Sequence, residues 1–166
     1  MIKEGLIELS DKIVASELPD EQVKRMVDSI NRRVESMGNY IVAVCNHEIG
    51  TATNKSLFHG GRLSQDDYKF RLESLDMRRR TAHENAMASI RGLNALCDKF
   101  GVPHICPDTN DRWKLGNFCA EVTEELFMSG TGKAQEKSRD PIHDIVGRVK
   151  TGESIGIRPI FNGDAR

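Results

Sequence analysis

The sequence predicts an all-α fold, in which a helical bundle is built on a long antiparallel helical hairpin and is followed by an irregular, glycine-containing C-terminal tail. Two observations predict this fold. Apolar residues recur at alternating steps of four and three through two long segments, which is the spacing of one face of an α-helix. Only 5% of the 166 residues are aromatic, and the other core candidates are aliphatic residues that suit helices better than sheets.

The first part of the chain is expected to hold two helices. One covers residues 2–16, and the next begins after Pro19, whose fixed φ suits the start of a helix. The apolar spacing continues without a slip across Gly38, so we expect a single helix from 20 to 48. The alternative is that the helix breaks at this glycine and that residues 40–45 form a strand.

A loop is expected over residues 50–63, which contain three glycines and several small polar residues. Ser64 then opens a long helix, because an acidic residue three positions later completes a capping box. That helix ends at Gly101, since glycine tolerates the left-handed conformation that follows many helices. A turn rich in proline and aspartate follows at 104–109, and a further helix carries the apolar positions between 115 and 126.

We divide the chain into a helical bundle domain, residues 1–130, and a C-terminal extension, residues 131–166, that docks on the bundle or on a neighbouring subunit. Within the extension we expect a short helix over 141–149 and an extended segment over 155–161. Two helices of about thirty residues would each reach about 45 Å. The shorter helices cannot cover apolar seams of that length, so we expect a homo-oligomer, a dimer or higher.

The composition limits the functional classes. Lys and Arg total 24 against 25 Asp and Glu, so no non-specific nucleic-acid binding is expected. No stretch approaches the length of a membrane span and the N-terminus has no apolar signal core, so we expect a cytoplasmic protein that does not contact a membrane. No cofactor is expected.

Four cysteines without a Cys-x-x-Cys pair indicate reduced thiols, and Cys45, Cys97 and Cys119 lie on or near apolar stripes that predict a place in the core. The alternative is a zinc site that would require distant residues to converge, although their spacing matches no common zinc module. Its ligands would be Cys97, His104, Cys106 and Cys119.

The apolar stripe of the long helix is interrupted for about two turns by Asp76, Arg79 and His83. Arginine forks match phosphate and carboxylate oxygens, a protonated histidine adds a donor, and an aspartate can hold an arginine in place. We therefore predict a pocket for a small anion. The expected ligand-binding residues are Asp76, Arg78, Arg79, Arg80, His83, Arg112 and Trp113.

The competing interpretation of this patch is structural. In it, Asp76, Arg79 and His83 form a buried bridge that fixes the helix register, while Arg78 and Arg80 are solvated. No nucleophile stands near His83 in the sequence, so we assign no catalytic residue. Trp113 ends the polar turn that begins at Asp108, and a packed tryptophan there would serve as an anchor, whereas an exposed Trp113 beside Arg112 could stack on a base.

Glu121 and Glu124 lie three residues apart on a predicted helix, which places two carboxylates on one face as a divalent metal requires. This pair resembles the first metal motif of the MazG-like all-α nucleotide pyrophosphohydrolases. The resemblance implies a metal-dependent nucleotide hydrolase. The second acidic pair of that family is not found among Glu136, Asp140 and Asp144.

A second resemblance covers about thirty residues, from Tyr68 to Cys97, and includes Asp76, the arginine triplet and His83. This stretch is similar to a bacterial and prophage-type helical domain family of unknown function, which implies a helical cytosolic protein and assigns no activity. Three functional classes follow. We favour a protein that binds a nucleotide-like anion, as a phage-type sequestering or sensing protein would. The alternatives are the metal-dependent hydrolase and a helical protein–protein adaptor without a ligand.

Overall fold

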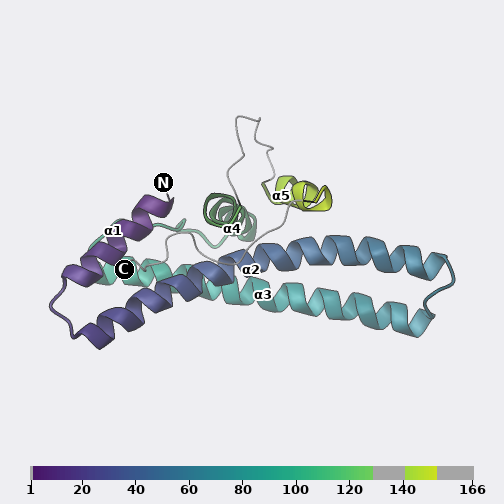
Figure 1. Ribbon diagram of the computed structural model, residues 1–166, viewed down its shortest axis with the longest axis horizontal. Helices are drawn as coiled ribbons and strands as arrows, with labels where there is room; N and C mark the ends of the chain where they lie inside the picture. The colour runs from purple at the N-terminus through teal and green to yellow at the C-terminus, as the bar shows by residue number, and fades with distance from the viewer. Residues whose placement is uncertain (1, 129–140, 153–166) are drawn as a thin grey trace.

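The computed structural model describes residues 2–128 and 141–152, and within these ranges it contains helices and no strands. The all-α prediction is confirmed for this part of the chain. The helices are α1 (Ile2–Ala15), α2 (Asp20–His59), α3 (Gln65–Phe100), α4 (Arg112–Leu126) and α5 (Pro141–Lys150). Helices α2 and α3 form the predicted antiparallel hairpin and run side by side along the length of the molecule (Figure 1).

The ends of α3 follow from local chemistry. Ser64 precedes its first turn, and the Ser64 hydroxyl oxygen accepts a hydrogen bond from the backbone N–H of Asp67 at 3.1 Å. Gly101 ends the helix with a φ of 71°, in the left-handed region where a glycine has no steric cost. Both predicted ends are therefore confirmed.

Gly38 does not break α2, so residues 40–45 are helical and the single-helix prediction is confirmed. A Cβ atom at Gly38 would lie 2.8 Å from a ring carbon of Phe127, which follows α4. The glycine therefore serves close packing rather than chain reversal. The physical consequence is that α4 can approach the middle of α2.

The predicted loop over 50–63 is wrong, because α2 continues to His59 and the connection to α3 is only a few residues long. Here too the small residues serve packing. A Cβ atom at Gly50 would lie 2.9 Å from a methyl carbon of Leu75 on α3. The Asn54 amide donates to the Gly50 carbonyl oxygen at 2.8 Å and accepts from Arg71 at 3.3 Å, which joins this part of α2 to α3.

The core lies where α1, α4 and α5 cover the hairpin (Figure 1). It is aliphatic in the main, and its fully buried side chains include Leu6, Ile41, Leu93 and Leu126. Helix α5 packs on α2 and α4, which confirms the predicted helix at 141–149. The expected extended segment at 155–161 lies outside the described residues, and the boundary at residue 130 stays a prediction.

The other end of the hairpin projects beyond α1, α4 and α5 (Figure 1). We call residues 46–78 the arm. Asn54 is the only arm residue in the buried class, and the apolar side chains of the arm are half-buried or exposed. Phe58 and Tyr68 stack across its tip with ring centroids 4.5 Å apart. Among the described helices, none combines the length and apolar character needed to cross a membrane.

Candidate anion-binding site

An open cavity of about 450 Å³ lies on the hairpin where the arm meets the covered part. Six of the seven predicted ligand-binding residues line it. Arg78 is the exception, because it is exposed on α3 and takes no part in the lining. The lining residues are Tyr40 from α2, Asp76, Arg79, Arg80 and His83 from α3, and Arg112 and Trp113 from α4.

Local structure explains why two helices meet at this cavity. The α3 residues are three or four positions apart and so share one face of the helix. On α4, the Asp111 carboxylate caps the N-terminus by accepting from the backbone N–H of Trp113 at 2.9 Å and of Lys114 at 3.4 Å. This cap fixes the first turn of α4, so Arg112 and Trp113 are held at the edge of the cavity. The Trp113 side chain is 56% exposed, which excludes the packed-anchor interpretation.

Three guanidinium groups therefore face one cavity. Among the described residues, no carboxylate lies within 4.0 Å of Arg79, Arg80 or Arg112. Burial raises the pKa of Tyr40, and the Arg79 guanidinium close to the Tyr40 hydroxyl opposes that rise without reversing it. The lining thus carries three guanidinium groups against a single carboxylate, that of Asp76, and this carboxylate does not contact any of them.

Asp76 does not hold an arginine, so that part of the prediction is wrong. Its Oδ1 is 2.5 Å from Nε2 of His47, which faces α3 from α2. The Asp76 side chain is 59% exposed and Arg79 is exposed as well. The predicted buried bridge among Asp76, Arg79 and His83 is therefore also wrong. The Asp76 carboxylate instead contacts His47 of the neighbouring helix α2.

His83 lies half-buried in the wall of the cavity. Its ring contacts Tyr40 in an edge-to-face arrangement, with centroids 5.1 Å apart and an interplanar angle of 70°. Burial lowers the pKa of His83, and the positive charges of Arg112 and Arg79 lower it further, while Glu84 opposes them. His83 is therefore neutral at pH 7, and the protonated donor expected from the sequence is not the resting form.

The sequence prediction missed Tyr40 and His47. They stand seven residues apart on α2 and so lie on the same helical face, two turns from each other. This spacing is a usable signal, because it places both residues on one face when residues 20–48 form a single helix. The register between α2 and α3, which brings that face to Asp76 and His83, could not be obtained from the spacing alone.

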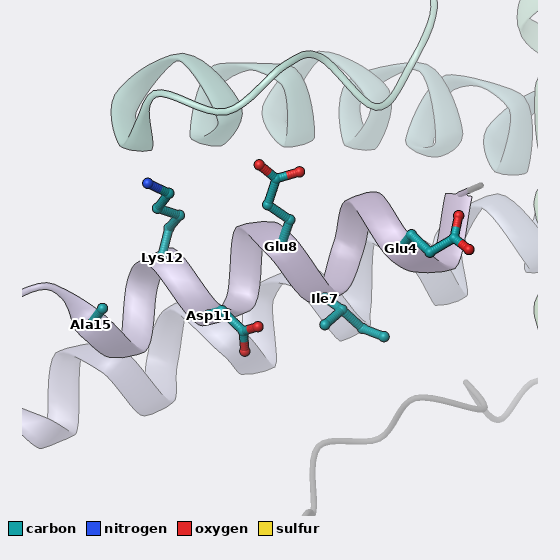
Figure 2. Close-up of a pocket in the computed structure, with 6 residues that line it drawn as sticks. All are labelled: Glu4, Ile7, Glu8, Asp11, Lys12 and Ala15. Carbon is teal, nitrogen blue, oxygen red and sulfur yellow. The ribbon is translucent and has the colours of Figure 1, made fainter.

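Two other cavities differ in chemistry. One of about 510 Å³ lies along α1, where Glu8 and Lys12 project to one side and Ile7 and Asp11 to the other (Figure 2). Its lining holds three carboxylates and one ammonium group, which does not suit an anion. A third cavity, of about 400 Å³, includes Asn94, whose amide bonds the backbone of Cys106.

Glu121 and Glu124, the two residues of the alternative metal site, have different surroundings. Glu124 forms an ion pair with Arg148 of α5, including a hydrogen bond of 2.6 Å to Oε1, whereas Glu121 is exposed on α4. In residues 2–128 and 141–152, no group of three or more His, Cys, Asp or Glu side chains is arranged to hold a metal ion.

The four cysteines are free and buried. Burial raises the pKa of Cys119 to about 12, and burial followed by the charge of Glu48 raises that of Cys45 to about 11. These thiols are therefore protonated at neutral pH. His104, the histidine of the alternative zinc set, instead bonds Asp98 and Asp108 through its two ring nitrogens, each at 2.6 Å.

Comparison with known proteins adds no relative: no protein-family model, curated protein or solved structure matches the chain. The functional assignment therefore depends on the chemistry of the cavity itself.

Proposed function

We propose that this protein binds a small anionic ligand of the nucleotide class in the cavity between α2, α3 and α4, as a sequestering or sensing protein. One observation carries the proposal. Arg79 and Arg80 of α3 and Arg112 of α4 converge on one open cavity without a carboxylate partner among the described residues. Converging unpaired guanidinium groups repel one another, so their arrangement is explained by an anion that lies between them.

The other lining residues favour a nucleotide over a simple anion. Trp113 offers an exposed indole beside Arg112, and bases stack on such aromatic faces. A cavity of about 450 Å³ is within the range of small-molecule sites in proteins. Three positive charges match a diphosphate better than a neutral nucleoside, so ADP is the probe of choice.

The test is calorimetric titration of the wild type and two arginine variants with ADP. Arg80→Ala should weaken binding by about tenfold or more, since one charge-assisted hydrogen bond to a phosphate is lost. Arg78→Ala removes the same charge two residues away on α3, at a position outside the cavity, so its affinity should stay close to that of the wild type.

The same variants separate binding from folding. Arg80 is exposed and has no ion pair within the described residues, so its removal should change the free energy of unfolding by no more than about 0.5 kcal/mol. A collapse of stability in Arg80→Ala would mean that the arginine is structural. Equal loss of affinity in the two variants would mean that ADP responds to overall charge and not to the cavity.

We also propose a homo-oligomer in the cytoplasm. The exposed Phe70 and Met77 on the arm support self-association, because large apolar side chains on a projecting hairpin favour a partner. Four free thiols support a reducing compartment. Light scattering on the purified chain tests the first part, and a monomeric mass would contradict it.

A further inference from the structure

We propose that Asp76 recognises the ribose hydroxyls of the bound nucleotide, so that the cavity selects ribonucleotides over nucleotides that lack these hydroxyls. This inference rests on the proposed function, because it concerns the same cavity. Its starting point is that Asp76 is the one carboxylate in the lining. A carboxylate repels a phosphate, so its presence in an anion site requires a separate explanation.

Asp76 is not explained as a counter-charge that neutralises the three arginines of the cavity. Within the described residues, the hydrogen-bond partner of Asp76 is His47 and none of the three cavity arginines. His47 contacts Oδ1 at 2.5 Å from the opposite helix, and its side chain is only 21% exposed. The contact therefore fixes the direction of the carboxylate, while the Asp76 side chain as a whole remains 59% exposed.

The second oxygen of Asp76 is the group available to a ligand. Oδ2 has no hydrogen-bond partner among the described residues. An ionised carboxylate accepts hydrogen bonds and cannot donate them. The part of the ligand that lies against Asp76 must therefore present donors, which a phosphate at neutral pH does not.

The position of Asp76 selects among the donors of a nucleotide. It stands one helical turn from Arg79 and Arg80, and side chains at this spacing have Cβ atoms about 5–6 Å apart. The donor must therefore lie close to the phosphates, as the ribose hydroxyls do. Donors on the edge of the base lie beyond the sugar, and the base itself is the part expected to stack on Trp113 of α4. An acidic side chain that binds ribose hydroxyls is also a recurrent device in other nucleotide-binding folds.

The experiment compares ADP with 2′,3′-dideoxyADP, and GDP with 2′,3′-dideoxyGDP, by calorimetric titration of the full chain. We expect the wild type to bind each ribonucleotide about tenfold or more tightly than its dideoxy counterpart, because hydrogen bonds to a charged acceptor are lost. Asp76→Asn should lose most of this preference and bind dideoxyADP at least as well as the wild type, since a repulsive charge is removed.

Glu73→Gln is the matched control, because it removes a carboxylate from the same helix one turn away and outside the cavity. It should keep the preference for ribose. Retained binding of inorganic tripolyphosphate by Asp76→Asn would show that its arginine site is intact.

The outcomes separate this inference from the proposed function. Equal affinity of the wild type for ADP and dideoxyADP would overturn the role of Asp76 and leave nucleotide binding in place. A preference for guanine that depends on Asp76, with no effect of the hydroxyls, would also overturn it, because the carboxylate would then read the base. No binding of any of the four nucleotides would overturn the proposed function itself.

Discussion

The two ends of the α2–α3 hairpin are built differently, although the same two helices form both. In the covered part, α1, α4 and α5 lie against the hairpin, and Ile41 and Leu93 are fully or almost fully buried. The arm projects beyond α1, α4 and α5 (Figure 1), and Asn54 is its one residue in the buried class. The arm is therefore held by half-buried contacts that a third layer does not complete.

The candidate site lies at the boundary between these two parts. Tyr40 belongs to the covered part and Asp76 to the arm, and α4 begins between them with Arg112. A cavity forms there because the third layer stops while the hairpin continues. The contrast shows why polar residues can interrupt the apolar stripe of α3 at this point: within the described residues, only the first turn of α4 reaches them.

The largest expected effect separates the two parts by stability. Ile41→Ala should lower the free energy of unfolding by about 2–5 kcal/mol, because it leaves a cavity in a closed core. Leu72→Ala in the arm should cost about 1 kcal/mol, since Leu72 is only half-buried. Urea unfolding followed by circular dichroism measures both. Equal losses would contradict the difference in burial.

A smaller effect is expected at the two helical glycines. Gly38→Ala places a methyl group 2.8 Å from the ring of Phe127, which is buried and cannot move away, so about 1–3 kcal/mol of stability should be lost. Gly50→Ala meets Leu75 at 2.9 Å, but this half-buried side chain can shift toward solvent. Its cost should be offset by the gain of about 0.5–1 kcal/mol from replacing a helical glycine. Thermal unfolding of both variants measures the two changes in stability. A larger loss of stability in Gly50→Ala than in Gly38→Ala would contradict this prediction.

The smallest effect concerns pH and the connection that holds α4 on the hairpin. Hydrogen bonds to Asp98 and Asp108 raise the pKa of His104 above its usual value of 6.5. The stabilisation is therefore fully present below pH 6.5 and is lost as the pH rises through the folded-state pKa. His104→Gln should show a smaller fall in Tm than the wild type when the pH rises from 6 to 9. An unchanged pH profile would mean that the two contacts do not contribute to stability.

The sequence predicted most of the fold because helix spacing and caps are local signals. Ser64 and Gly101 mark the ends of α3 through contacts and conformations within a few residues of the chain. Gly50 was wrongly assigned to a loop, because the residue it packs against, Leu75, is far away in the sequence. The same limit applies to the site. The residues on α3 share one face and were predicted together, but the pairing of Asp76 with His47 depends on the register of two helices.

The most direct test of nucleotide binding uses Trp113, the single tryptophan of the chain, as a reporter in the cavity wall. Titration of the wild type with ADP should change its emission in a saturable way, because a base that enters the cavity would stack on or shield an indole that is 56% exposed. Arg78→Ala should give the same curve, and Arg80→Ala should require about tenfold more ADP. Emission that does not change up to millimolar ADP in the wild type would contradict a nucleotide site in this cavity.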